Sequence, residues 1–185
     1  MTKKNNSTEP KEKKHPPLSH ACVGAIVYRN TKKGKEYLIQ KRDKPGTPYD
    51  EKWEFPVGIL EDSPDQRKSA FVQVLNEVQE EAGINPDNAT VITENKSTYQ
   101  SPEGDVVEGF TPYFQTHQLV GENPWYMTTF LVEVDTDASI VKESDETKEV
   151  QWIEEKKLKK MVTDNPEDFF SLQVPALQFH FDRSS

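Results

Sequence analysis

Cysteine is almost absent from this chain of 185 residues, because Cys22 is the only one. A single cysteine cannot form an internal disulfide, so the sequence gives no sign of an oxidising compartment. No apolar stretch approaches the roughly 20 residues that a membrane-spanning helix needs. The lysine-rich start also lacks the apolar centre of a secretory signal. We therefore expect a cytoplasmic protein that does not contact a membrane.

Positive charge is also in deficit, with 23 Lys and Arg against 32 Asp and Glu and a formal net charge of -9. Such a charge repels a polyanion, so we expect no extended binding to duplex nucleic acid. A small phosphorylated substrate is compatible with this charge if metal ions neutralise it locally. Hydrophobic residues make up only 33% of the chain, but they fall in blocks such as ACVGAIVY and TTFLVEV. Blocks of this kind build a core and exclude global disorder.

The length of the chain fits one domain with a substantial core. Residues 1–17 are polar and rich in lysine, and they end at Pro16 and Pro17. This composition predicts a flexible tail. Residues 18–185 are then expected to form a single domain, and the sequence does not indicate its oligomeric state.

Strand-like and helix-like segments are mixed along the chain. Residues 20–30 and 36–42 are rich in β-formers and flank the turn residues TKKGK, which predicts a hairpin. Further strands are expected at residues 53–58, 89–94, 106–120, 125–135 and 148–154, and helices at residues 154–162 and 165–181. Pro175 is expected to bend or split the last helix. The mixed order predicts an α+β fold, in which helices flank a mixed sheet.

A longer helix is expected near the middle of the chain. Ser63 has the character of an N-cap, Pro64 suits the first helical position, and Gly83 suits the position after the last turn. One apolar stripe recurs at helical spacing and consists of Ala70, Phe71, Val74, Leu75, Val78 and Ala82. Glu77 and Glu81 lie beside this stripe, with Glu80 further round on the same side. The helix should therefore dock by one face and present carboxylates along the edge of the contact.

Carboxylates at positions i, i+3 and i+4 of a helix can converge on one metal ion. Oxygen ligands of this kind suit Mg²⁺ or Mn²⁺. Taken alone, a run of glutamates is more often a solvated face than a metal site. The surrounding order of segments favours the metal site, because the strand WEFPVG and the acidic loop ILEDSP precede the helix EVQEEAGI.

In this order the segments resemble the Nudix hydrolase family, whose signature ends in R-E-U-x-E-E-x-G-U with U a bulky aliphatic residue. The second half of the signature fits Glu77, Val78, Glu80, Glu81, Gly83 and Ile84. The segment WEFPVG looks like the usual approach to the first half, so the box covers residues 58–84. Looser similarity extends over most of residues 20–162. The resemblance implies a Nudix-like α/β/α sandwich.

The resemblance also implies a pyrophosphohydrolase that cleaves a nucleoside diphosphate linked to another moiety. It implies Mg²⁺ or Mn²⁺ as cofactor and a small phosphorylated nucleotide as substrate. The implied metal ligands are Glu77, Glu80 and Glu81, with Glu77 and Glu80 as catalytic residues, Glu61 or Asp62 as the loop acid, and Gly58, Trp125 and Tyr126 as substrate-binding residues. The group that activates water is either Glu80 or an acid from a later loop, namely Glu143, Asp145 or Glu146.

The chain departs from the family pattern at three places. Gly58 and Glu77 are 19 positions apart, which is four more than the pattern has. Val57 replaces the first glycine of the usual pair. Asn76 replaces an arginine that, in the family, pairs with the loop glutamate and orients the catalytic carboxylates. Either Arg67 or Lys68 supplies that charge, or the activity is weakened.

These departures keep two other hypotheses open. One is a Nudix-fold module that binds a nucleotide but is catalytically weakened. The other is an acidic interaction domain, which requires the match to be accidental. Cys22 is expected to be a buried strand residue, and this counts against the related isopentenyl-diphosphate isomerases, which carry a cysteine in a different motif context.

Overall fold

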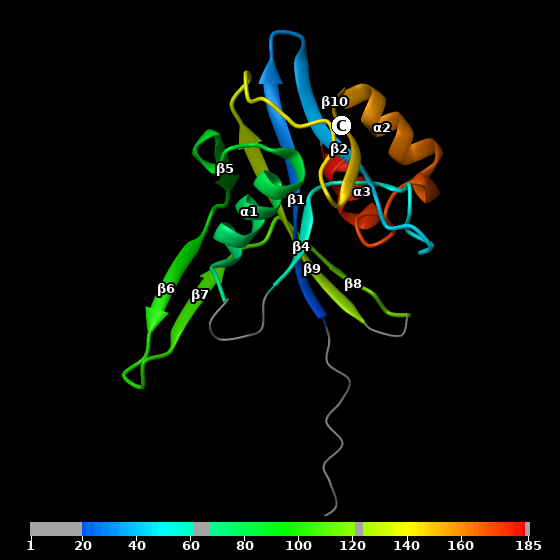
Figure 1. Ribbon diagram of the computed structural model, residues 1–185. Coiled ribbons are helices and arrows are strands. Elements are labelled where there is room, and N and C mark those ends of the chain that lie inside the picture. The colour runs from blue at the N-terminus through cyan, green and yellow to red at the C-terminus, as the bar shows by residue number, and fades with distance from the viewer. Residues whose placement is uncertain (1–19, 61–66, 121–123, 184–185) are drawn as a thin grey trace, which may run out of the picture.

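The computed structural model describes residues 20–60, 67–120 and 124–183 (Figure 1). The main sheet consists of β1 (His20–Thr31), β2 (Gly34–Arg42), β3 (Trp53–Glu54), β4 (Val57–Ile59), β5 (Ala89–Ile92), β8 (Phe114–His117), β9 (Trp125–Val134) and β10 (Thr147–Glu154). A second, two-stranded sheet consists of β6 (Lys96–Gln100) and β7 (Val106–Phe110). The helices are α1 (Ala70–Ala82), α2 (Glu155–Asp164), α3 (Val174–Arg183) and the short 3-10 helices η1 (Pro86–Asn88) and η2 (Pro166–Asp168). None of the described helices is long and apolar enough to span a membrane.

The main sheet has the central order β10-β2-β1-β9-β5, and β3 pairs with β2, β4 with β1 and β8 with β9. The expected hairpin of β1 and β2 is confirmed, with Tyr28 opposite Tyr37. β1 and β9 pair in parallel, whereas the other pairings of the sheet are antiparallel. The sheet is therefore mixed, as the order of segments predicts.

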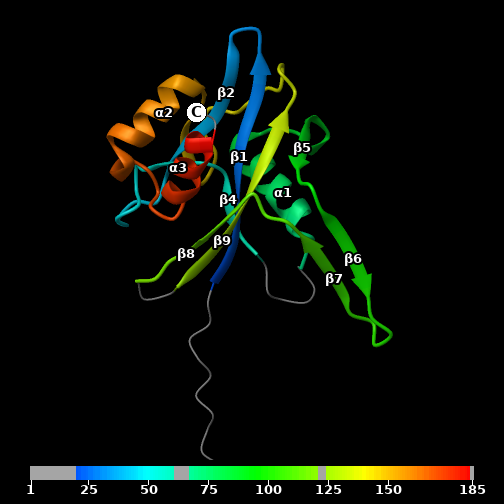
Figure 2. The same ribbon diagram turned by 180° about the vertical axis from the view of Figure 1, so that it is seen from behind.

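Helices cover both faces of this sheet, with α1 on one side and α2 and α3 on the other (Figures 1 and 2). Side chains alternate between the faces along each strand. On β1, Val23 and Val27 pack in the core under α1, whereas Ile26 and Tyr28 pack in the core under α2 and α3. This alternation explains why β1 is almost continuously apolar, and it confirms the α/β/α sandwich.

The start of α1 differs from the prediction. The helix begins at Ala70 rather than at Pro64, and the side chain of Ser69 caps it by accepting a hydrogen bond from the Phe71 amide at 3.2 Å. Glu108 of β7 strengthens this cap, because its carboxylate accepts hydrogen bonds from the Ser69 hydroxyl at 2.6 Å and from the Ala70 amide at 3.0 Å. The predicted cap at Ser63 and Pro64 and the predicted tail at residues 1–17 lie outside the described residues.

Gly83 ends α1 as predicted, in a left-handed conformation with φ of 72°. Its amide donates to the Gln79 carbonyl at 2.8 Å, the pattern of a helix that terminates at glycine. A β-carbon at this position would lie 2.6 Å from Val141 Cγ1. Both the backbone conformation and the packing therefore require glycine here.

Three other segments differ from the prediction. The expected strand at residues 53–58 is divided into β3 and β4, and the Pro56 carbonyl between them accepts from the Ala25 amide at 2.9 Å. The expected strand at residues 106–120 is likewise divided, and β7 pairs with the unpredicted β6 in a hairpin that projects from the body (Figure 1). The helix expected at residues 165–181 is divided into η2 and α3, and Pro175 stands in the first turn of α3, so the segment is split as one of the two expected outcomes and is not bent.

A buried polar group ties α3 to the sheet. His180 Nε2 lies 2.8 Å from the Tyr37 hydroxyl, and His180 Nδ1 lies 2.7 Å from the Tyr113 hydroxyl. A neutral imidazole has one donor and one acceptor nitrogen, which serves two hydroxyl groups. Burial of His180, which is 5% exposed, and the positive charge of Lys35 lower the pKa of its imidazole to about 4. The network is therefore built around an uncharged histidine.

The His180 network makes the stability of the protein depend on pH. The unfolded chain takes up a proton near pH 6.5, whereas the folded pKa is about 4, so stability is lost as the pH falls across this interval. We expect the wild-type free energy of unfolding to fall by about 2–3 kcal/mol from this source between pH 7 and pH 4. Urea unfolding of His180→Phe, compared with His117→Phe as a control at an exposed histidine, measures it. An equal pH dependence in both variants would contradict the assignment.

Candidate functional site

One pocket of about 740 Å³ is lined by side chains of α1, of strands β1 to β4 and of the segment 170–172. Its lining carries nine charged side chains, namely Glu54, Glu77, Glu80, Glu81, Glu146, Arg42, Lys44, Arg67 and Lys68. The remaining lining residues are Cys22, Val57, Gly58, Ile59, Gln73, Trp125, Phe170 and Leu172. The structure thus brings together eight of the residues that the sequence singles out as functional candidates, since Gly58, Glu77, Glu80, Glu81, Trp125, Arg67, Lys68 and Glu146 all belong to this lining.

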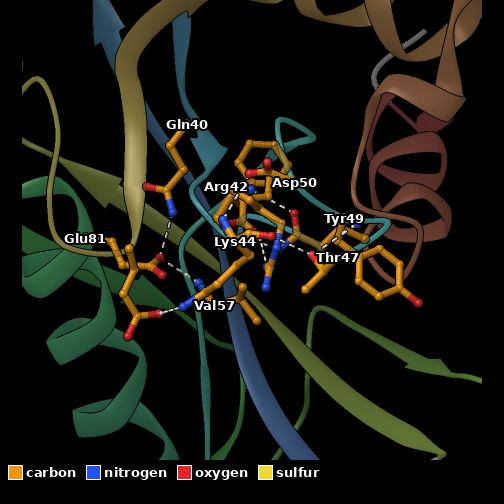
Figure 3. Close-up of polar contacts among 12 residues, drawn as sticks. Gln40, Arg42, Lys44, Thr47, Tyr49, Asp50, Val57 and Glu81 are labelled. Carbon is orange, nitrogen blue, oxygen red and sulfur yellow. Dashed lines mark hydrogen bonds and ion pairs between the residues drawn. The ribbon is translucent and has the colours of Figure 1, made fainter. Parts of the chain in front are cut away.

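Glu81 is the most deeply buried of the three helix carboxylates, with 6% of its surface exposed. Its Oε2 atom accepts hydrogen bonds from Gln40 Nε2 at 2.7 Å and from the Val57 amide at 3.0 Å (Figure 3). These two donors belong to β2 and β4, so the carboxylate joins α1 to the sheet. Burial raises the pKa of Glu81 well above its usual value, and the negative charge of Glu54 raises it further.

Glu77 lies against β4 at Gly58. A β-carbon at Gly58 would lie 1.9 Å from the Glu77 carboxyl carbon, so a larger residue at this position would displace the Glu77 carboxylate from β4. Gln73 donates a hydrogen bond to the Glu77 carboxylate. Burial raises the pKa of Glu77, and the negative charges of Glu80 and Glu146 add to this rise.

Glu54 is a site residue that sequence reasoning missed. It is 2% exposed and forms an ion pair with Arg42 Nη1. Burial raises the pKa of Glu54 to about 7, although the charge of Arg42 opposes the rise. The sequence does contain a sign of this role, because Glu54 stands between two aromatic residues in the apolar segment WEFPVG. A charge that is buried in such a segment needs a partner. The partner is 12 positions away along the chain, and only the pairing of β2 with β3 brings it close.

Arg42 joins the carboxylates to the aromatic wall of the pocket. Its guanidinium carbon lies 4.4 Å from the centre of the Phe170 ring, a cation–π contact. Its Nε atom is buried and has no hydrogen-bond partner among the described residues. Asn76 does not line the pocket. Arg42 therefore supplies, from β2, a fixed positive charge beside the buried carboxylates that Asn76 cannot supply from α1.

The other predicted site residues lie elsewhere. Tyr126 does not line the pocket and is 38% exposed. Its ring stacks on the His117 ring, with 4.0 Å between the ring centres. Glu143 and Asp145 also lie outside the lining. Glu61 and Asp62 lie outside the described residues, so the loop acid stays a prediction.

Cys22 is buried, as expected for a residue of β1, and it lines the pocket. Burial raises the pKa of its thiol to about 12. A thiol with such a pKa keeps its proton at neutral pH and is a poor nucleophile. Cys22 therefore forms part of the pocket wall but does not supply a reactive thiolate.

Carboxylate oxygens are suitable ligands for a hard divalent cation. Those of Glu77 and Glu81, however, point toward hydrogen-bond donors of the protein. Among residues 20–60, 67–120 and 124–183, no three His, Cys, Asp or Glu side chains are arranged to hold a metal ion. Glu81 accepts from Gln40 and Val57, and Glu77 accepts from Gln73. The acids raise one another's pKa, so a cation placed among them would relieve their repulsion. The donor set therefore fits Mg²⁺ or Mn²⁺ if the carboxylates rotate toward the pocket.

Comparisons with known proteins agree on the family of this chain, but the curated relatives differ in the reaction that they catalyse. Residues 18–173 match the family model described as NUDIX domain. The chain is 25% identical over 169 residues to an RNA pyrophosphohydrolase of Roseobacter denitrificans, covering 86% of this chain and 91% of the relative. It is 24% identical over 160 residues to an isopentenyl-diphosphate Delta-isomerase of Aliivibrio fischeri, covering 86% and 78%. The crystal structure of a MutT protein from Methanosarcina mazei shares the fold, with a TM-score of 0.59, 21% identity and coverage of 91% and 96%.

The ion pair of Arg42 and Glu54 predicts a stability effect that depends on pH. Arg42→Met keeps an apolar stem beside Phe170 but leaves a buried carboxylate without its cation, which costs about 3–5 kcal/mol. Removing the cation raises the folded pKa of Glu54 further above its unfolded value, so the variant loses stability as the pH rises from 6 to 9. Urea unfolding across this range measures the loss. The double variant Arg42→Met/Glu54→Gln should recover stability at high pH, and a loss that does not change with pH would contradict the assignment.

The contact of Gly58 with Glu77 predicts a coupling between the two positions. Gly58→Ala should lower the free energy of unfolding by about 0.5–1.5 kcal/mol, because the added carbon displaces the Glu77 carboxylate and its hydrogen bond from Gln73. In a Glu77→Ala background the same substitution should cost little, since the overlapping atoms are gone. A double-mutant cycle by urea unfolding measures this coupling. Equal costs in both backgrounds would show that Glu77 does not lie against β4.

Proposed function

The chain belongs to the Nudix family, and we propose that it is a pyrophosphohydrolase that uses Mg²⁺ or Mn²⁺ to cleave a nucleoside diphosphate linked to another moiety. The observation that carries this proposal is the gathering of Glu77, Glu80 and Glu81 in one pocket with four basic side chains. Acids suit a divalent cation, and basic groups suit the phosphates that the cation would accompany. The RNA pyrophosphohydrolase among the relatives supports a pyrophosphate bond as the point of attack.

We assign the metal-binding role to Glu77, Glu80 and Glu81. A bound divalent cation would contact phosphate oxygens and offset the charge that develops as a P–O bond breaks. The protein's contribution is to hold the carboxylates in place beforehand. Gly58 allows Glu77 to reach the edge of β4, and the hydrogen bonds from Gln40 and Val57 fix the position of Glu81.

The basic side chains would bind and orient the phosphates. Lys44, Arg67 and Lys68 line the same pocket as the carboxylates, and cations at these positions stabilise a bound polyphosphate electrostatically. We assign a positioning role to Arg42, because it holds Glu54 and thereby limits the repulsion that Glu54 exerts on Glu81. In this way Arg42 offsets the absence of an arginine at position 76.

Two acids of the pocket are candidates for activating the attacking water. Glu80 is exposed on α1, and Glu146 lies in the loop before β10. Lys44 Nζ lies 2.7 Å from the Glu146 carboxylate, which holds this side chain at the pocket. Either acid can take a proton from water if it lies within hydrogen-bond reach of it. The comparison of Glu80→Gln with Glu146→Gln separates them.

Asn76 favours a second candidate function, a nucleotide-binding module with weakened catalysis. The pocket would then keep its cations and its aromatic wall but would not orient the carboxylates well enough for hydrolysis. This candidate predicts that a nucleotide binds and shifts the melting temperature, but that no substrate is turned over.

The active-enzyme proposal is tested with a substrate panel in Mg²⁺ or Mn²⁺ that includes nucleoside triphosphates, dinucleoside polyphosphates, nucleotide sugars and capped RNA ends. At least one substrate should release a phosphate-containing product. Glu81→Gln should lower kcat by about 100-fold or more with the fold intact, whereas Glu103→Gln, at an exposed turn, should retain full activity. Binding without turnover would support the binding module. If the metal ions change neither heat flow nor melting temperature, both functions are excluded.

A further inference from the structure

The hairpin of β6 and β7 has little protein around it. The two strands form a sheet of their own, and β7 lies between β6 and the body of the protein (Figures 1 and 2). All five residues of β6 are exposed, and so are Val106 and Val107 on β7. A two-stranded hairpin with so little cover is marginally stable by itself, and further strands stabilise it. The outer edge of β6 is the place where such a strand can be added.

The backbone pattern of the hairpin shows which groups of β6 face away from β7. The Thr111 amide donates to the Asn95 carbonyl at 3.2 Å, and the Ser101 amide donates to the Asp105 carbonyl at 2.8 Å. Because such positions alternate in an antiparallel pair, the odd-numbered residues of β6 bond to β7 and the even-numbered residues face outward. No other described strand pairs with β6. Its free edge therefore carries the backbone amides and carbonyls of Lys96, Thr98 and Gln100.

This edge is not protected in the way that proteins usually protect one, with a lysine, a proline or a bulge. Lys96 is the lysine of β6, but its ammonium group lies 4.1 Å from the centre of the Phe71 ring and 3.7 Å from the Glu108 carboxylate. Pro102 stands beyond the end of the strand. Residues 97–100 carry neither charge nor proline, so the edge is open to another strand.

The free edge of β6 is complementary to itself. When two copies pair antiparallel about a two-fold axis at Thr98, the outward-facing groups meet, with Thr98 opposite Thr98 and Lys96 opposite Gln100. Threonine opposite threonine is a favourable pair, and no like charges lie directly opposite each other. The middle outward-facing residue of β7 is Glu108, so the same pairing along β7 would oppose two carboxylates. The charges therefore favour β6 as the paired edge.

The exposed side chains of the hairpin fit the same arrangement. Tyr99 lies opposite Val107, and Ser97 lies opposite Gly109 on the same face of the hairpin. Tyr99 is 62% exposed and Val107 is 54% exposed. Pairing about Thr98 places Tyr99 of one copy opposite Ser97 of the other, with Gly109 beyond it. These two small residues leave room for the tyrosine ring to lie across the strands of the second copy.

We propose that β6 pairs antiparallel with β6 of a second copy of this chain, about a two-fold axis at Thr98, to form a four-stranded sheet. Two copies complete such an interface, so the assembly stops at a dimer. Only five residues of each copy pair, so the buried area is at most about 1,200 Å², the low end for specific contacts. We therefore expect a dissociation constant on the order of 10–100 µM. No residue of β6 lines the pocket of the candidate site, so the dimer is independent of the proposed hydrolysis.

Analytical ultracentrifugation of the full chain, from about 1 µM to about 1 mM, measures the dimer. Thr98→Lys should weaken association by about tenfold or more, because two ammonium groups then meet on the axis. Thr90→Lys is the same change at an exposed threonine of the edge strand β5, and it should leave association within about twofold of the wild type. A chain that stays monomeric throughout, or a dimer that Thr98→Lys does not weaken, would overturn the proposal.

The two-fold axis makes a more specific prediction. Thr98→Lys and Thr98→Glu should each associate weakly, because each variant brings like charges together. An equimolar mixture of the two should regain association, since opposite charges then meet on the axis. Recovery in the mixture also shows that both variants are folded. If the mixture stays monomeric while both variants keep the melting temperature of the wild type, Thr98 does not lie on the axis and the proposal fails.

Hydrogen exchange followed by NMR locates the paired edge. The outward-facing amides of Lys96, Thr98 and Gln100 should exchange about tenfold or more slowly at concentrations that favour the dimer. The outward-facing amides of Val106 and Phe110 on β7 are the internal control, and they should exchange equally at both concentrations. Slower exchange at β7 with no change at β6 would contradict the proposal.

Discussion

The arrangement of the site depends on one buried carboxylate, that of Glu81. Its hydrogen bonds to Gln40 and to the Val57 amide join α1 to β2 and β4. The Thr147 hydroxyl binds the Glu81 carbonyl at 3.2 Å and adds β10 to the same point. A buried carboxylate without such donors would cost several kcal/mol. The register of α1 against the sheet is therefore set by this polar contact as well as by apolar packing. It also places Glu77, one turn before Glu81, and Glu80, the residue directly before it, because both belong to the same helix.

The carboxylates around Glu81 repel one another, and basic side chains from other elements offset this repulsion. Glu54 raises the pKa of Glu81, and Arg42 moderates the charge of Glu54. The stacking of Arg42 on Phe170 restricts the guanidinium to one orientation. Under the proposed function, Arg42 would supply from a strand the positive charge that the family resemblance expects from a helix. The position of that charge would then matter more than the element that carries it.

Patterns that repeat over short distances allowed much of the fold to be predicted. The alternation in β1 and β2 predicts their hairpin, and the apolar stripe of α1 predicts which face docks and which edge carries Glu77 and Glu81. The partnership of Glu54 with Arg42 could not be predicted, because it depends on the pairing of β2 with β3 across an irregular loop. The start of α1 was wrong for a similar reason, since Glu108 of a distant hairpin caps the helix at Ser69. The sequence left open whether Pro175 bends or splits its helix, because proline suits the first turn of a new helix as well as a kink, and the structure shows the split.

The charged pocket adjoins a second pocket of about 400 Å³, and the two parts of this cleft differ because different elements supply them. Side chains on α1 and on the loops around β2 and β10 make the charged part. Helical spacing and strand pairing place acidic and basic side chains next to one another there. The turn at residues 170–172 and the ends of β8 and β9 make the aromatic part. The turn is held by the Phe170 amide, which donates to the Trp53 carbonyl at 2.8 Å, and by Gln173, whose side chain bonds both backbone groups of Phe55. The same segment, WEFPVG, therefore positions Glu54 for the charged part and the Phe170 ring for the aromatic part. Changes in this segment would move both ends of the cleft together, whereas changes at Ser171 alter one end alone.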